Sequence, residues 1–164
     1  MKEFVKIPKE RIPILIGAEG SVKRHLEKRT STKITVSEDV EIEGETFDVL
    51  LAANVVKAIA RGFSPENAFL LLDEEYELNI ITLSGETDKT VKRLMGRVIG
   101  TNGKTREKIE SMCRAKISIY GKTVSIIAPN SAHLDAATKC VETLLKGKTH
   151  GYAYKVMDDV RKKR

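Results

Sequence analysis

The sequence predicts an α+β protein that contains two tandem copies of one module, each with the order strand, helix, helix, strand, strand, helix. Three observations support this prediction. Short runs rich in β-branched residues alternate with amphipathic helical runs, which is typical of an α+β chain. A pair of glycines three residues apart occurs twice, as Gly17 and Gly20 and as Gly100 and Gly103. The length of 164 residues suits two small domains.

The residues around the two glycine pairs also repeat. At an offset of 83 residues, Leu26 falls on Ile109 and Glu27 on Glu110, and the strand-like run 33–36 falls on 116–119. Nearer the end of each copy the offset becomes 85, and Ile59 falls on Leu144. Because a helix, a strand and a terminal helix recur in one order with the glycines, the pattern indicates an internal repeat.

The first copy is predicted to occupy residues 1–73. Its strands are runs rich in β-branched and aromatic residues, at 4–7, 33–36 and 40–44. Its helices cover 11–16, 21–29 and the apolar run from residue 47, which Gly62 stops. A short helix over 67–72 follows, with Ser64 as its N-cap and Pro65 at its first position. The charged segment 73–75 is the predicted linker.

The second copy is predicted to occupy residues 74–164. Its strands are 76–83, 116–120 and 123–127, and the last two are joined by a tight turn at Gly121 and Lys122. Thr87 or Asp88 caps a helix that reaches residue 97, and a second helix ends near residue 113. Ser131 is expected to cap a helix that runs to 146. A short final helix over 152–160 and a basic tail over 161–164 complete the chain.

Charge divides unequally between the two copies. Residues 1–84 hold 11 Lys and Arg against 15 Asp and Glu, whereas residues 85–164 hold 18 against 8. The first part therefore carries −4 and the second +10, which together give the net charge of +6. This asymmetry predicts that the second half contacts a nucleic acid and that the first half has another role.

The composition favours an intracellular protein that binds no metal or cofactor. No apolar run approaches the roughly 18 residues of a membrane span, and the first eight residues contain no long apolar core. We therefore expect a cytoplasmic location. Cys113 and Cys140 read as buried thiols rather than a disulfide. The three histidines share no metal-ligand spacing with them, and no catalytic constellation is apparent.

The stretch from Val98 to Ile109 carries the strongest functional pattern. Two glycines in a short turn allow another chain to approach the backbone closely, and Lys104, Arg106 and Lys108 follow at once on a helix. A nucleotide-binding P-loop would require glycine at position 98, where valine stands, and a strand before the loop rather than a helix. We therefore interpret the stretch as a clamp for a phosphate backbone and not as a nucleotidase site.

The segment Val98-Ile-Gly-Thr-Asn-Gly-Lys-Thr105 and the order of elements resemble the KH domain of RNA-binding proteins in its type I topology. The resemblance covers nearly the whole chain as two tandem copies. It implies a turn that grips about four single-stranded nucleotides, with the bases in an adjacent groove. Carried onto this sequence, it implies these RNA-binding residues: Arg97, Ile99, Gly100, Thr101, Asn102, Gly103, Lys104, Arg106, Lys108, Lys116, Ile117, Ser118 and Ile119.

Two departures from the KH pattern leave alternatives open. A cation, Arg106 or Lys23, stands where the family usually has an aliphatic residue, and it could contact a phosphate or extend into solvent with its stem packed. In the first copy, Glu19 places a carboxylate inside the turn and Ser21 replaces Lys104. We expect the first copy to be structural or protein-facing. A weaker RNA-binding set remains there: Gly17, Ala18, Gly20, Lys23 and Arg24.

The whole arrangement is similar to the Dim-two or Partner-of-Nob family of small-subunit ribosome assembly factors, in its archaeal form, with the Krr-type factors as close relatives. That resemblance implies a non-catalytic protein that binds single-stranded RNA near the 3′ end of the 16S ribosomal RNA. It also implies two partners, the endonuclease of the Nob type and the alpha subunit of initiation factor two. The alternatives are a protein-interaction scaffold, a solvated basic helix paired with Glu107 and Glu110, and a solubilising C-terminal tail.

Overall fold

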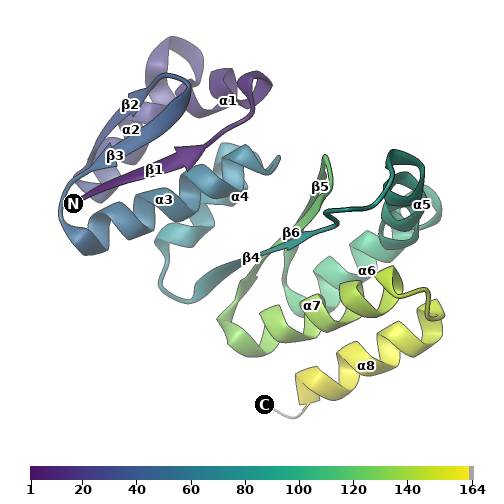
Figure 1. Ribbon diagram of the computed structural model, residues 1–164. Helices are drawn as coiled ribbons and strands as arrows, with labels where there is room; N and C mark the ends of the chain where they lie inside the picture. The colour runs from purple at the N-terminus through teal and green to yellow at the C-terminus, as the bar shows by residue number, and fades with distance from the viewer. Residues whose placement is uncertain (163–164) are drawn as a thin grey trace. The chain divides into compact units, whose positions relative to one another are not determined.

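The computed structural model describes residues 1–162, and the chain divides into two compact units, 1–74 and 75 onward. Each unit is an antiparallel three-stranded sheet backed by helices, so the predicted α+β class and the order of elements are confirmed (Figure 1). The division between the units falls within the charged segment 73–75. Residues 163 and 164, which belong to the predicted basic tail, lie outside the described residues.

The first unit contains one module followed by a short helical extension. Its sheet has the order β1-β3-β2, so the strand that is last in sequence lies in the middle. Val5, Ile34 and Ile42 alternate with exposed positions and are buried toward the helices. The elements are β1 (Lys2–Lys6), α1 (Ile12–Ile16), α2 (Ser21–Thr30), β2 (Lys33–Val36), β3 (Asp39–Glu43), α3 (Thr46–Ala60), α4 (Pro65–Ala68) and the 3-10 turn η3 (Phe69–Leu72).

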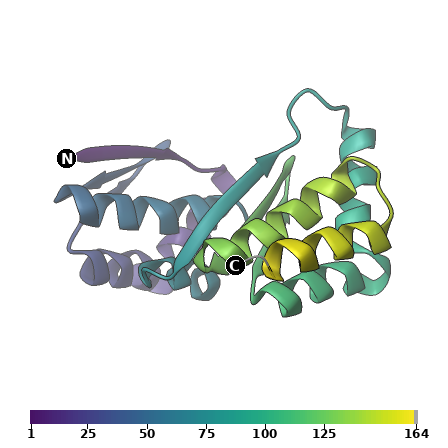
Figure 2. The same ribbon diagram turned by 90° about the horizontal axis from the view of Figure 1, so that it is seen from below.

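The second unit repeats this order with longer elements. Its sheet has the order β4-β6-β5, with Ile117 of β5 opposite Ile126 of β6. Helices α7 and α8 pack side by side (Figure 2). The elements are β4 (Tyr76–Thr82), α5 (Asp88–Ile99), α6 (Lys104–Cys113), β5 (Lys116–Tyr120), β6 (Thr123–Pro129), α7 (Asn130–Leu145) and α8 (His150–Lys162).

The core of the second unit lies between its sheet and its helices. It includes Val98 from α5, Ile109 from α6, Ile126 from β6 and Met157 from α8, all fully buried. The two cysteines belong to this core, as expected. Burial in apolar surroundings raises the pKa of Cys113 to about 11 and that of Cys140 to about 12, because the thiolate form loses its hydration.

Most helix boundaries follow the caps that the sequence indicates. The Ser64 hydroxyl accepts from the Asn67 N–H at 3.2 Å, and the Thr87 hydroxyl accepts from the Thr90 N–H at 3.2 Å. The Ser131 cap is wrong, because α7 begins one residue earlier and Asn130 Oδ1 accepts the His133 N–H at 3.0 Å. Helices α5 and α8 also extend beyond their predicted ranges.

Two searches for common functional features gave no result among residues 1–162. None of the helices there combines the length and the hydropathy that a membrane crossing requires. No group of three or more His, Cys, Asp and Glu side chains in the same range is arranged to hold a metal ion.

Candidate nucleic-acid interface

The segment Gly100–Gly103, here called the second turn, joins α5 to α6 without any spare length. Gly100 has φ 75° and ψ 173°. A Cβ atom at Gly100 would lie 2.6 Å from the Thr105 Cβ and 2.8 Å from the Thr105 backbone nitrogen. Only glycine therefore allows α6 to start this close to the end of α5.

The tip of the second turn presents backbone to solvent. Thr101 and Asn102 are exposed, and Asn102 and Gly103 both adopt left-handed conformations, with φ of 56° and 74°. Asparagine tolerates this region better than most residues because its short polar side chain hydrogen-bonds locally. The Gly103 N–H donates to the Gly100 carbonyl at 3.1 Å, which closes the turn. The result is an exposed, preformed backbone loop without a carboxylate.

The segment Gly17–Gly20, here called the first turn, has nearly the same backbone. Gly17 has φ 75° and ψ 176°, Glu19 has φ 55° and Gly20 has φ 76°. Glu19 thus occupies the left-handed position that Asn102 holds in the second turn, and its side chain is exposed. An Arg24 guanidinium nitrogen donates to the Glu19 carbonyl across the turn. The two turns therefore differ in side-chain chemistry and not in geometry.

The cations that follow the second turn have different surroundings. Lys104 is exposed and makes no ion pair with a residue in the described range. Arg106 Nε lies 3.6 Å from Glu110 Oε1, and in the first unit Lys23 Nζ lies 3.3 Å from Glu27 Oε1. The unusual cation of the KH pattern is thus paired with a glutamate one helical turn later in both units. Lys104 is the cation beside the second turn that remains available to an anion.

Arg97 performs a structural task that the sequence did not indicate. Its Nε donates to the Leu144 carbonyl at 2.9 Å, and its Nη2 donates to the Lys148 carbonyl. His150 Nε2 in turn donates to the Arg97 carbonyl at 3.0 Å. These bonds fix the end of α5 to the segment that joins α7 and α8. The guanidinium is therefore committed to the fold, although its charge remains beside the second turn.

The strand residues of the predicted set are only partly accessible. Lys116 is exposed, and Ser118 and Ile119 are half-buried. Ile117 is 3% exposed and belongs to the core, and its N–H donates to Glu110 Oε2 at 2.9 Å. The expectation that the Ile117 side chain walls a base groove is therefore wrong, because inward positions of a half-buried strand alternate with outward ones.

An apolar groove of about 650 Å³ lies on one side of α5. Its floor and walls are formed chiefly by Val91, Met95 and Ile99 of α5 and by the turn between β5 and β6. Ile99 is 37% exposed, so its side chain is available to a ligand there. The lining residues are Asp88, Val91, Lys92, Met95, Gly96, Ile99, Gly121 and Lys122.

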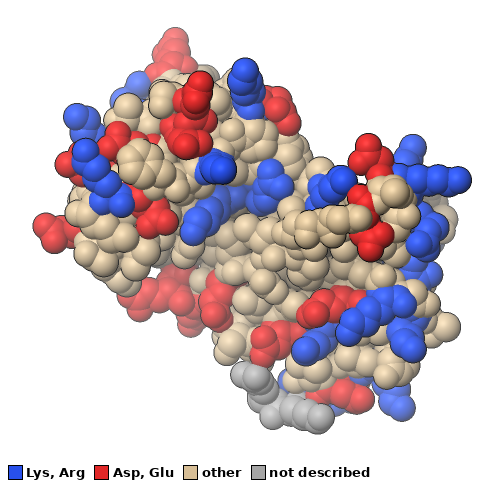
Figure 3. Space-filling model, in the orientation of Figure 1, with Lys and Arg blue, Asp and Glu red and all other residues tan. Residues whose placement is uncertain are grey.

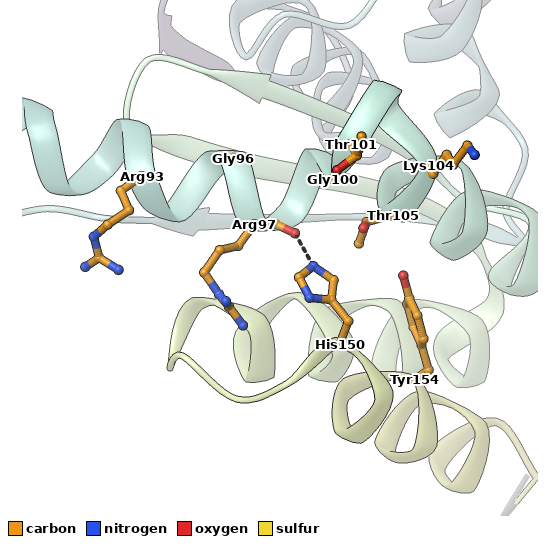
Figure 4. A pocket seen from close by; sticks show the side chains of 9 residues that line it. All are labelled: Arg93, Gly96, Arg97, Gly100, Thr101, Lys104, Thr105, His150 and Tyr154. Atoms are coloured by element: carbon orange, nitrogen blue, oxygen red, sulfur yellow. Dashed lines mark hydrogen bonds between the residues drawn. The ribbon is translucent and has the colours of Figure 1, made fainter.

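A second cavity, of about 480 Å³, lies beside α5 and the second turn and is lined largely by polar and cationic side chains (Figure 4). Helix α8 contributes His150 and Tyr154 to it, and α5 contributes Arg93. These three residues were missed by sequence reasoning, which treated α8 as a short terminal helix. We call this space the cationic cavity; it is lined by Arg93, Gly96, Arg97, Gly100, Thr101, Lys104, Thr105, His150 and Tyr154.

The surface charge of each unit agrees with the asymmetry of the sequence. In the second unit, lysine and arginine side chains gather along the edge formed by α5 (Figure 3). In the first unit, acidic and basic side chains are interspersed on the face shown. An exposed glycine turn, an apolar groove and a cationic edge therefore occur together in the second unit.

Two such modules, each with a Gly-x-x-Gly turn between its first two helices, define a tandem pair of type I KH domains. The model of the eukaryotic-type KH domain (KH-domain type I) matches residues 76–162, and the model of the KH domain matches residues 2–58. The KH domain-containing protein MJ0443 of Methanocaldococcus jannaschii is 39% identical over 98% of this chain and 74% of its own length. The chain belongs to the Dim2p and PNO1 family of KH-domain proteins.

Solved structures give the same family assignment. Dim2p from Pyrococcus horikoshii OT3 is 42% identical with a TM-score of 0.89, covering 97% of this chain and 99% of that one. A chain from the crystal structure of the a/eIF2alpha-aDim2p-rRNA complex of the same organism is 42% identical with a TM-score of 0.90, covering 100% of this chain and 96% of that one. The pre-rRNA-processing protein PNO1 of Saccharomyces cerevisiae is 27% identical over 80% of this chain, which spans 46% of the yeast protein.

Proposed function

We propose that this protein holds single-stranded RNA through its second unit, without catalysing a reaction, during assembly of the small ribosomal subunit. The observation that carries the proposal is the second turn itself. Its tip is exposed, glycines at both ends fix its backbone, and it has no carboxylate. KH domains use such a turn to clamp about four nucleotides by their backbone.

The roles of the individual residues follow from their surroundings. The backbone of Gly100–Gly103 contacts phosphates, and Lys104 neutralises them because its ammonium group has no competing partner in the described part of the chain. Ile99 and the apolar groove receive bases. Arg106 and Lys108 contribute less, since each already contacts a side chain. Lys116, Ser118 and Ile119 border the bound strand.

The relatives support a ribosomal target. One similar structure is described as a complex of Dim2p with a/eIF2alpha and rRNA, and the fungal relatives are named pre-rRNA-processing proteins. By analogy, the proposed RNA is the 3′ region of 16S ribosomal RNA. The proposed protein partners are the alpha subunit of initiation factor two and an endonuclease of the Nob type, and the proposed location is the cytoplasm.

The first unit is proposed to keep the KH fold without using its turn for RNA. Two like charges about 5 Å apart repel by roughly 1 kcal/mol in water, and by more where water is excluded. Glu19 would therefore oppose a phosphate at the first turn, and Arg24 is already bonded across it. This unit is free to face a protein. Its residues Gly17, Ala18, Gly20 and Lys23 form at most a weaker RNA contact.

The double change Thr101→Asp and Asn102→Asp tests the clamp. Both positions are exposed, and aspartate tolerates the left-handed conformation of residue 102. We expect the affinity for single-stranded RNA, measured by fluorescence anisotropy at moderate salt, to fall about tenfold or more, which corresponds to losing one charge-assisted hydrogen bond. Circular dichroism checks that the variant is folded.

A matched control exists in the first turn. Ala18→Asp places two adjacent carboxylates there, beside the native Glu19, and should leave RNA affinity unchanged. Unchanged affinity in the second-turn variant would show that the clamp lies elsewhere. The rival role, a protein scaffold, predicts no salt-dependent RNA binding, whereas each phosphate contact to a single strand adds about 0.7 to the log–log salt slope.

A further inference from the structure

We propose that the cationic cavity binds one phosphate group of the RNA, outside the nucleotides held by the second turn. The inference rests on the proposed function of that turn. It adds a contact that depends on α8, a helix that follows the βααββα module. The ligand chemistry is a phosphodiester on a single strand.

The charge of the cationic cavity selects an anion. Arg93, Arg97 and Lys104 line it, and no carboxylate does so. Arg93 and Lys104 make no hydrogen bond or ion pair with any of residues 1–162. The Arg97 guanidinium is held by two carbonyls, so its charge is fixed in place. Arg93 and Arg97 both extend from α5 toward α8 in Figure 4.

The Tyr154 hydroxyl supplies a fixed donor. Its ring lies under the Lys108 ammonium, 4.2 Å from the ring centroid, and contacts the His150 ring edge-on with centroids 6.3 Å apart. The hydroxyl points from α8 toward Thr105 (Figure 4) and has no hydrogen-bond partner within the part of the chain that the structure describes. A phosphate offers several acceptor oxygens, so it matches an arrangement of guanidinium, ammonium and hydroxyl donors.

The repeat shows that this arrangement is specific to the second unit. At the offset of 85 residues Tyr154 corresponds to Phe69, and at 83 Lys108 corresponds to His25. His25 and Phe69 also contact each other, with ring centroids 5.1 Å apart. Both units therefore place an aromatic ring against the same helix position. In the second unit the ring carries a hydroxyl and its neighbour carries a permanent charge.

Gly96 connects the cationic cavity with the apolar groove, because it lines both. A Cβ atom at this position would meet no atom within 4 Å, so nothing in the chain requires glycine there. Glycine inside a helix costs about 1 kcal/mol relative to alanine. The low point it creates on α5 lets an RNA backbone pass between the bases in the groove and a phosphate in the cavity.

The test is a scan in which each phosphate of a single-stranded oligonucleotide is replaced in turn by a neutral methylphosphonate. In the unmodified protein, one replacement outside the clamped nucleotides should weaken binding about tenfold, the effect of losing one charge-assisted hydrogen bond. In Arg93→Ala and in Tyr154→Phe, the same replacement should have no further effect. Lys89→Ala removes an exposed charge from the same helix outside both cavities and should retain the effect.

Other outcomes would overturn the proposal. Equal loss at every phosphate in Arg93→Ala, or the same result in Lys89→Ala, would indicate diffuse attraction rather than a subsite. Competition by inorganic phosphate that protects the cavity without coupling to any RNA position would indicate a free-anion site instead. Because the scan also reads the clamped phosphates, failure of the clamp and failure of this subsite give different patterns.

Discussion

The carboxylate of Glu110 accepts the backbone N–H of Ile117 at 2.9 Å, and the first unit contains the same bond between Glu27 and the N–H of Ile34, also at 2.9 Å. Each glutamate joins the helix after the glycine turn to the start of the next strand. Each also receives a cation one helical turn earlier, Arg106 or Lys23. The repeat thus preserves a polar joint that sets the angle between the turn helix and the sheet.

Removal of this joint should lower stability. Glu110→Ala leaves the Ile117 N–H without its acceptor in a partly buried place, so we expect a loss of about 1–3 kcal/mol in the free energy of unfolding. Glu110→Gln retains an acceptor oxygen and should cost less. Urea denaturation of both variants measures the difference, and an equal loss in the two would show that charge rather than the hydrogen bond matters.

The two glycines of the second turn should differ in their tolerance of a side chain. Gly103→Ala meets no atom within 4 Å but keeps a left-handed φ of 74°, which costs a non-glycine residue roughly 1–2 kcal/mol. Gly100→Ala carries a similar φ and in addition a clash with the Thr105 backbone, so it should destabilise more. Thermal unfolding ranks the two variants, and a Gly103→Ala that is the less stable would contradict this geometry.

The charge at the left-handed position of each turn should control RNA affinity. Asn102→Glu gives the second turn the residue of the first, and we expect it to weaken RNA binding, because it brings a carboxylate to the phosphates. Glu19→Lys should leave affinity the same or raise it. Anisotropy titrations of both variants give the answer, and a clear drop in Glu19→Lys would show that the native glutamate takes part in binding.

The raised pKa values of the buried thiols predict both their reactivity and a pH dependence. The thiolate is the reactive form, so Cys113 and Cys140 should resist a thiol reagent at pH 8 until the protein is denatured. Below the unfolded value of 9.0 both states keep the thiols neutral, and stability is unaffected. Above it the unfolded thiols ionise first, so stability falls by at most about 1.4 kcal/mol per thiol and pH unit. Rapid labelling of the native protein would contradict the burial.

Sequence reasoning predicted the features that depend on local patterns. The offset of 83 residues placed Glu27 and Glu110 at equivalent positions, and the Ser64 cap followed from hydroxyl and proline chemistry at a helix start. The module order was recoverable because each strand and helix has its own periodicity. These features depend on residues close in sequence or on an exact internal repeat.

The remaining features depend on contacts between distant segments. The Arg97 guanidinium bonds to carbonyls 47 and 51 residues away, which no local pattern indicates. Ile117 alternates into the core because of the register of β5 against β6. The contribution of α8 to the cationic cavity was missed for the same reason, although the offset that aligns Phe69 with Tyr154 could have suggested a conserved place for an aromatic ring.

The most direct test of the central claim is an NMR titration of the labelled protein with single-stranded RNA. The account predicts that amide resonances of Gly100–Lys104, and those of Ile99 and Gly96 on α5, shift on binding, while those of Gly17–Gly20 remain in place. Shifts confined to the first turn, or an unperturbed second turn in a protein that binds RNA, would contradict it.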